Sequence, residues 1–342
     1  VSNVADLLDQ CISTVPMDKK ISMAIELEKQ SMKDPRITKS SGSGYGENES
    51  EVFIANSNGI LKSYKSSGCY LGASVVAEKG DQKNTGSEYC SRVCFKDLVS
   101  LEEIAKIASE RAWELLDPRM INTQKAAILF DPDIASSLLG GIISAVNGER
   151  VLQGASFLKD YLEKQFASPL LTIIDDGIKK KSLGSAPFDG EGVPTMKNIL
   201  VQNGILKSFI YNTKAAKRAG VKSTGNASRG GFNSLPGIGT HNIYLESGKN
   251  TRNEIIATTR KGLLLKEVTG YGINAVNGNF SGGASGFWIE NGEIAFPVKG
   301  VTIAGKAIDI LNGIDMMGND IDLSRTFAAP TFRVAEMQIG GK

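Results

Sequence analysis

Only one histidine, His241, occurs among the 342 residues of this sequence, and this limits the metal chemistry available to the chain. Catalytic zinc sites usually take two histidines and a third ligand, with a glutamate to activate water. No carboxylate lies within three residues of His241, which stands between Gly239-Thr240 and an apolar run. A structural or solvent-facing histidine is therefore favoured over a catalytic one.

Two acidic clusters are the remaining candidates for a cation site. They are Asp175-Asp176 and Asp189-Gly190-Glu191. Carboxylate oxygens suit Mg²⁺ or Ca²⁺, but neither cluster has the spacing of an EF-hand loop. Acidic turns are common, so the sequence favours ordinary turns at both places.

Cys90 and Cys94 are four residues apart, a spacing that suits chelation on a helix. In the strand that we infer here they would lie about 13 Å apart, at ~3.3 Å per residue, which is too far for joint ligation. With Cys11 and Cys69 there are only four cysteines, so no disulfide framework is indicated. We expect Cys90 and Cys94 to be core thiols, and the protein to be cytoplasmic with reduced thiols.

Two glycine-rich segments, residues 270–272 and 282–286, invite comparison with phosphate-binding loops. No Lys-Ser/Thr pair follows either, so a nucleotide site is disfavoured. Glycines also allow another backbone to approach, so an extended peptide could pair here by strand addition; a bulged hairpin is the competing interpretation. The candidate peptide-binding residues are Asn279, Phe280, Ser281, Gly282, Gly283, Ala284 and Ser285.

Charge and hydropathy argue against nucleic acid and membrane partners. The 39 basic and 37 acidic residues leave a net charge of +2, so no global field attracts nucleic acid. The longest apolar stretch, residues 136–146, is too short to span a bilayer, and no signal segment opens the sequence.

The first part of the sequence predicts mixed helix and strand. Residues 17–32 have helical periodicity, and residues 51–55 and 60–64 flank an Asn-Gly turn typical of a hairpin. Strands are predicted at 70–77 and 87–95, and Ser100 with Glu103 predicts the capped start of a helix.

The second part begins with an apolar run at 125–130 and a predicted helix at 134–146. Short β-like runs follow, separated by Asn-Gly turns at 203–204, 277–278 and 291–292; the clearest hairpin joins 287–289 to 294–296. The predicted fold class is α+β. A mixed helix and strand region, residues 1–118, precedes a largely antiparallel, barrel-like, β-rich domain, residues 119–342.

Several sequence blocks resemble one known family in their order along the chain. They are Ala55-Asn56-Ser57-Asn58-Gly59, residues 185–192, Ser223-Thr224-Gly225-Asn226-Ala227, residues 268–298, Val301-Thr302-Ile303-Ala304-Gly305 and Gly318-Asn319-Asp320. Together they resemble the PmbA (TldE-like) branch of the TldD/PmbA peptidase family. In family members an α/β domain precedes the middle region, and the matching blocks lead us to expect that Val1 falls inside the inter-domain stretch.

The TldD branch of this family holds its metal with His-Glu-x-x-x-His on a helix and a cysteine near the C-terminus. Aligned on the Gly154-Ala155-Ser156 block, the corresponding positions here are Leu139, Gly140 and Ser144. No cysteine lies between Asp320 and Lys342. The resemblance therefore transfers no catalytic residue to this chain.

The resemblance implies a non-catalytic subunit of a metallopeptidase that processes or degrades unfolded or leader peptides. It implies a TldD-like partner, with no cofactor in this chain and zinc only in that partner. Family names also refer to modulation of DNA gyrase, although the charge pattern offers no support for direct DNA contact. Two alternatives remain: a self-associating homodimer that binds peptides, and a metal-independent Ser/Thr hydrolase using a neutral lysine or His241 as base.

Overall fold

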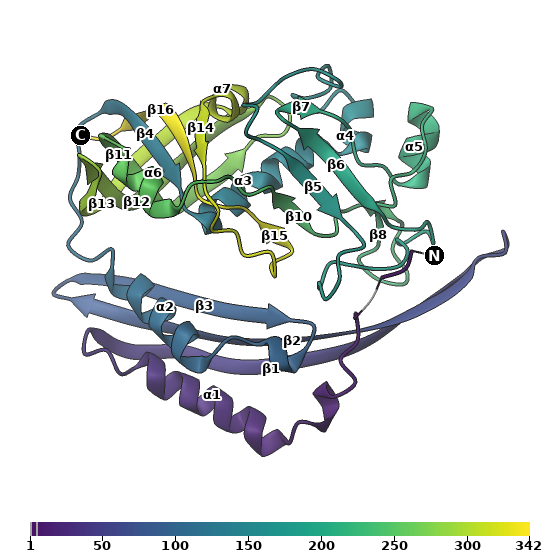
Figure 1. The fold of residues 1–342 in the computed structure, drawn as a ribbon, viewed down its shortest axis with the longest axis horizontal. Helices are drawn as coiled ribbons and strands as arrows, with labels where there is room; N and C mark the ends of the chain where they lie inside the picture. Colours follow the sequence, from purple (N-terminus) through teal and green to yellow (C-terminus); the bar gives the residue numbers. More distant parts are fainter. Residues whose placement is uncertain (1, 5) are drawn as a thin grey trace.

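The computed structural model describes residues 2–4 and 6–342, and it has the predicted α+β architecture in two layers (Figure 1). The lower layer of Figure 1 is a three-stranded antiparallel sheet in the order β1-β2-β3, with helix α1 on its far side. Its elements are η1 (Ile12–Thr14), α1 (Met17–Ser31), β1 (Ile37–Ala55), β2 (Leu61–Lys79), β3 (Gln82–Arg92), η2 (Phe95–Asp97) and α2 (Leu101–Trp113).

Helices α1 and α2 cover this sheet because each presents an apolar stripe to it. Leu27 of α1 and Ile104 of α2 are fully buried against Leu71 of β2. Helix α2 begins where the capping residues predict, since the Ser100 hydroxyl accepts a hydrogen bond from the Glu103 backbone N–H at 3.2 Å.

The β1–β2 hairpin is much longer than the sequence predicted. Each strand has 19 residues, and the segments predicted separately at 60–64 and 70–77 form one continuous strand. Strand β3 also ends at Arg92, earlier than predicted. The sequence did not predict one continuous strand because polar residues separate the apolar runs. This part of the ribbon is exposed, so its strands need no alternation of apolar and polar residues.

The upper layer contains a closed barrel and a second sheet. Its elements are β4 (Gln124–Phe130), α3 (Pro132–Ala145), α4 (Gly148–Leu152), β5 (Ile173–Asp176), β6 (Lys197–Gln202), β7 (Ile205–Leu206), α5 (Thr213–Ala219), β8 (Ala227–Ser228), β9 (Gly237–Ile238), β10 (Ile243–Leu245), α6 (Arg252–Ala257), β11 (Lys261–Ile273), β12 (Asn279–Glu290), β13 (Glu293–Lys306), α7 (Ala307–Asn312), β14 (Ile314–Met317), β15 (Phe327–Ala328) and β16 (Phe332–Gly340).

The barrel confirms the barrel-like β-rich prediction. Its strands run in the order β13-β12-β11-β4-β16, and β13 pairs with β16 to close it. Most pairs are antiparallel, while β4 and β11 are parallel. The second sheet has the order β15-β10-β5-β6-β7, and α3 lies between it and the barrel in one shared core (Figure 1).

The Asn-Gly turns explain how consecutive strands reverse. Asn203 and Gly204 both have positive φ (49° and 78°), as do Asn291 and Gly292 (51° and 85°). Two consecutive positive φ angles match the hairpin turn that the Asn-Gly sequence predicts. Strand β12 thus meets β13 at the predicted hairpin.

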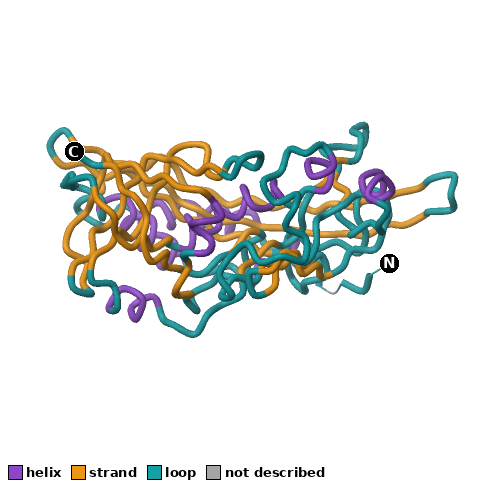
Figure 2. The backbone as a smooth tube through the Cα atoms, turned by 90° about the horizontal axis from the view of Figure 1, so that it is seen from above, coloured by secondary structure: helices purple, strands orange, loops and turns teal. Residues whose placement is uncertain are grey.

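Seen from above, the molecule is elongated, and the tip of the β1–β2 hairpin extends beyond the remaining chain (Figure 2). Within the described residues, no helix combines the length and apolar character that crossing a bilayer requires.

Candidate functional site

Helix α3 carries the three positions that correspond to the family metal motif. Leu139 is 1% exposed and packs in the main core, while Gly140 is exposed and Ser144 is half-buried. Leu138 and Ile142 are also buried, which confirms that one face of this helix packs against the core. The helix is thus held in place by apolar contacts, with Gly140 on its open side.

A cavity of about 780 Å³ lies against this open side of α3. Ser136, Ser137 and Gly140 of α3 line it, together with strand β3, helix α2 and the loop before β15. It lies where the three-stranded sheet meets the upper layer, and a second cavity of about 510 Å³ shares several of its residues.

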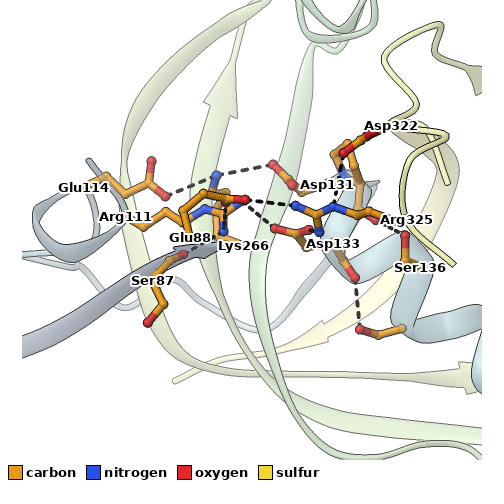
Figure 3. A network of polar contacts seen from close by, with 12 residues as sticks. Ser87, Glu88, Arg111, Glu114, Asp131, Asp133, Ser136, Lys266, Asp322 and Arg325 are labelled. Carbon is orange, nitrogen blue, oxygen red and sulfur yellow. Dashed lines mark hydrogen bonds and ion pairs between the residues drawn. The ribbon is translucent and has the colours of Figure 1, made fainter. Parts of the chain in front are cut away.

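Four charged side chains form a closed ring of ion pairs beside this cavity (Figure 3). Arg111 of α2 lies 2.7 Å from Glu88 of β3 and 2.6 Å from Asp133 of α3. Arg325 of the loop before β15 lies 3.2 Å from Glu88 and also pairs with Asp133. Each arginine therefore joins a carboxylate of the lower layer to one of the upper layer.

Further charges extend this ring along the same boundary. Lys266 of β11 lies 3.3 Å from Asp131 and 3.2 Å from Glu114, and Arg252 lies 2.7 Å from Asp131. Asp131 is the N-cap residue of α3, yet its side chain makes no capping hydrogen bond because it is turned toward these cations. The ring and its extension fix the orientation of the two layers.

Burial dominates the electrostatics of Glu88. The residue is 8% exposed, and desolvation raises the pKa of its carboxyl although Arg111 and Arg325 lower it. The Arg111 guanidinium N–H near Glu88 donates instead to the Ser87 carbonyl at 2.9 Å, so Oε2 of Glu88 has an ion pair but no hydrogen bond. Two arginines and two carboxylates balance in charge, so the ring offers no strong field to an ionic ligand.

The side chains at the three motif positions of α3 do not fit a metal ion. Leu139 is apolar and Gly140 has no side chain, so only the Ser144 hydroxyl could offer an oxygen, which is a weak ligand for zinc. No group of three or more histidine, cysteine or acidic side chains with ligand geometry occurs in the part of the chain that is described.

The acidic clusters serve the loops that surround β5. Asp175 is fully buried and accepts hydrogen bonds from the His241 backbone N–H at 2.8 Å and from Asn226 at 2.6 Å. Asp189 accepts three backbone N–H groups, including that of Ala227 at 2.9 Å. Burial raises the pKa of both carboxyls, so both are loop-stabilising groups rather than free cation ligands.

His241 is held by two backbone carbonyls. Its Nδ1 lies 3.2 Å from the Gly184 carbonyl and its Nε2 lies 2.8 Å from the Gly225 carbonyl. Carbonyl oxygens only accept, so these contacts suit a donor and leave no serine or threonine hydroxyl for the ring to activate. The structural interpretation of this histidine agrees with its contacts.

Three of the four cysteines are core residues, including Cys90 and Cys94 as the sequence predicted, whereas Cys11 is exposed. Cys69, Cys90 and Cys94 are buried, and burial raises the pKa of Cys69 to about 12. Burial also raises the pKa of Cys90 and Cys94, which keeps these thiols protonated and poorly nucleophilic. Cys94 lies beyond the end of β3, so the strand predicted to hold both residues holds only Cys90.

The candidate peptide-binding segment, residues 279–286, does not lie on an open strand edge. These residues belong to β12, which pairs with β11 on one edge and with β13 on the other. Its backbone groups are therefore engaged within the barrel, and an incoming strand has no edge to join. The glycines permit close packing of strands instead: a Cβ added at Gly286 would lie 1.9 Å from the Leu264 carbonyl oxygen.

Sequence reasoning did not identify the ring of ion pairs. Its members lie far apart in the chain, at Glu88, Arg111, Asp133 and Arg325, and none belongs to a recognisable short motif. The available signal was weak: Asp133 immediately precedes the helix predicted at 134–146, and acidic residues are common at the start of a helix without any special role.

Two family models match the chain in succession. The PmbA/TldA metallopeptidase central domain matches residues 12–116, and the PmbA/TldA metallopeptidase C-terminal domain matches residues 123–341. The Metalloprotease PmbA of Escherichia coli O157:H7 is 32% identical over 329 residues, which covers 96% of this chain and 71% of that protein.

Solved structures share the same architecture. A Thermotoga maritima protein named for modulation of a DNA gyrase superposes with a TM-score of 0.92 at 30% identity, over 99% of this chain and 78% of that one. TldE from Thermococcus kodakarensis superposes with a TM-score of 0.87 at 25% identity, over 96% and 75% of the two chains.

The fold and the site define a class: a two-layer α+β chain in which a closed barrel is joined by ion pairs to a long-hairpin sheet. The matching family models and relatives identify the family. The chain belongs to the PmbA/TldD family of metallopeptidases, and relatives of both its PmbA and TldD branches resemble it.

Proposed function

We propose that this chain is the PmbA-type, non-catalytic subunit of a TldD/PmbA-like metallopeptidase that processes or degrades unfolded or leader peptides. One observation carries the proposal: α3, the helix that corresponds to the family metal helix, has Leu139, Gly140 and Ser144 at the ligand positions. Zinc and the catalytic glutamate would then come from a TldD-like partner, and the pair would act in the cytoplasm.

The surroundings of α3 support this role. A catalytic zinc site keeps an open position for water and a general base near the metal. Here the nearby carboxylates Glu88 and Asp133 are each paired with an arginine of the opposite layer, Glu88 with Arg325 and Asp133 with Arg111. An arrangement that holds two layers together suits a subunit that shapes a complex better than one that activates water.

A peptidase assay after reconstitution tests the proposal. The tagged chain is expressed with a TldD-like protein from the same cell, isolated, and incubated with a quenched fluorescent, unstructured peptide, with and without added zinc. We expect the two chains to co-purify and cleavage to require both of them. Zinc-dependent cleavage by this chain alone, or a failure of the two chains to associate, would contradict the proposal.

A further inference from the structure

The distal half of the β1–β2 hairpin is a two-stranded ribbon, which we call the arm (residues 48–66). Strand β3 pairs with β2 only from Cys69 to Lys79, so it does not reach the arm. Figures 1 and 2 show the arm running past the end of the upper layer. A two-stranded ribbon is only marginally stable in water by itself, so the neighbours of the arm matter.

One face of the arm is anchored to the upper layer. The Lys62 amine donates to the Gly192 carbonyl at 2.7 Å, and the Tyr64 ring packs edge-on against Phe188 with centroids 5.2 Å apart. These contacts hold the arm against the loops that surround His241, and they leave the outer edge of β1 uncovered.

The outer edge of β1 presents unpaired main-chain groups. The Asn56 backbone N–H donates to the Ile60 carbonyl at 3.0 Å, so the backbone groups of Asn56 point toward β2. Along β1, residues that point toward β2 alternate with residues that point away from it. Counting back by twos, the N–H and C=O groups of Glu51, Phe53 and Ala55 point away from β2. Among the described residues, β2 is the only strand that pairs with β1.

A groove of about 860 Å³ runs along this edge. Residues 51–55 of β1 form one wall, and loops that carry Asn226, Arg229 and Phe232 form the opposite wall. Phe232 on the opposite wall is 99% exposed, and Phe53, which alternates with Val52 and Ile54 along β1 and so lies on the other face of the arm, is 69% exposed. Exposed aromatic side chains beside an unpaired strand edge are typical of a binding surface.

Side-chain hydrogen bonds, two of them from buried groups, hold the opposite wall in place. Asp189 binds the Ala227 backbone, Asn226 binds Asp175, and the Arg229 guanidinium donates to the Gly190 carbonyl at 2.7 Å. Such a network fixes irregular loops that lack a sheet or helix of their own. The groove therefore has a preformed wall facing a strand edge.

We propose that this groove binds an extended peptide segment, which adds to the edge of β1 as a third strand. The hydrogen-bonding pattern of the edge indicates a peptide ligand. Outward backbone N–H and C=O groups occur at every second residue from Glu51 to Ala55, and this spacing matches the main chain of an extended peptide. Val52, Phe53 and Phe232 would receive apolar side chains. Three strands are also more stable than two, so the peptide would stabilise the arm.

This inference goes beyond the proposed function because it places a peptide site on this chain without its partner. The binding test accordingly uses this chain alone, and a failure here would leave the pairing with a TldD-like subunit untouched. The probe is a fluorescein-labelled, capped peptide of alternating threonine and valine with a lysine at each end. A matched probe carries N-methyl groups on every second backbone nitrogen along one edge.

Fluorescence anisotropy separates main-chain pairing from simple apolar contact. We expect the parent peptide to bind and the N-methylated peptide, whose side chains are the same, to bind at least about tenfold more weakly, equal to ~1.4 kcal/mol. Equal binding of the two probes, or no binding of either, would overturn the proposal. This comparison needs no variant of the protein, so it holds even where a substitution disturbs folding.

Two substitutions at one position locate the site. Phe53→Ala removes only the ring, whereas Phe53→Pro also removes the outward N–H, and proline is tolerated on a strand edge. We expect the proline variant to bind the parent probe several-fold more weakly than the alanine variant, with the same circular dichroism spectrum. Equal affinities would contradict edge pairing.

The competing occupant is a second copy of this chain, joined through the same edge. Sedimentation velocity distinguishes it. A dimer that Phe53→Pro dissociates, with no binding of the free peptide, would overturn the proposal in favour of self-association. A monomer that binds the peptide supports the proposal.

Discussion

Strands β12 and β1 are both long and glycine-containing, but they differ in what their edges can do. Strand β12 pairs with β11 and β13 inside a barrel that the β13–β16 contact closes. Strand β1 pairs with β2 alone, and its distal outer edge faces a groove. Glycine content therefore does not mark an open edge in this molecule; the closure of the sheet decides it.

The largest expected difference between the two regions is in core packing. Ile142 on α3 is 1% exposed, so Ile142→Ala should lower the free energy of unfolding by about 2–5 kcal/mol. Leu61 in the arm is 81% exposed, and Leu61→Ala should change the free energy of unfolding by no more than about 0.5 kcal/mol. Urea unfolding of both variants checks this, and similar losses would show that the arm packs as tightly as the core.

The ring of ion pairs between the layers should give the next effect. Arg325→Ala leaves Glu88 and Asp133 each with one arginine, so we expect a loss of about 1.5–3 kcal/mol. Lys125→Ala removes an exposed pair with Glu336 and should cost about 0–1 kcal/mol. Thermal unfolding at low and high salt measures both. Equal, salt-sensitive losses would show that the ring behaves as a surface ion pair.

A pair of glycines compares the two sheets directly. Gly286→Ala forces a Cβ against the Leu264 carbonyl in the closed barrel and should cost about 1–3 kcal/mol. At Gly44 of β1 a Cβ would meet nothing within 4 Å, so Gly44→Ala should stay within about 0.5 kcal/mol. Chemical denaturation tests the difference; a tolerated Gly286→Ala would mean that the barrel strands can separate.

The smallest effect is a pH dependence that identifies the dominant force on Glu88. Burial raises its folded-state pKa above the ordinary value of 4.5, so the folded protein binds more protons between the two pKa values. Its contribution to stability is therefore greatest at low pH and falls as pH rises through that window. The stability of the wild type relative to Glu88→Gln should decrease from about pH 4.5 upward.

Asp322 provides the control with the opposite sign. Burial opposes ionisation there, but hydrogen bonds from Ser324 outweigh it and lower the pKa of Asp322. Its contribution is present above the unfolded-state pKa and is lost as pH falls. Unfolding titrations of Glu88→Gln and Asp322→Asn should therefore slope in opposite directions. An advantage of wild-type Glu88 that grows with pH would show that the arginines, and not burial, control this carboxyl.

Local signals predicted local structure well. Residue type and spacing within a few positions were enough to predict three features: the Ser100 cap, the turns at 203–204 and 291–292, and the apolar face of α3. The barrel-like character of the second half also followed from repeated turns between short apolar runs.

Long-range features could not be predicted in the same way. Barrel closure joins Thr302 to Gly340, and the ion-pair ring joins Glu88 to Arg325, so neither leaves a short pattern in the sequence. The arm was predicted only in part. The sequence indicated a hairpin at its tip, residues 51–55 and 60–64, but not the full length of the two strands, because their exposed polar stretches lack the alternation that identifies a half-buried strand.

The zinc content of this chain alone tests the central claim most directly. Purified protein is loaded with zinc, dialysed extensively and analysed by inductively coupled plasma mass spectrometry. With Leu139, Gly140 and Ser144 on α3, we predict far less than one zinc per chain. Stoichiometric zinc that is lost on Ser144→Ala would contradict the account, because α3 would then be a metal helix after all.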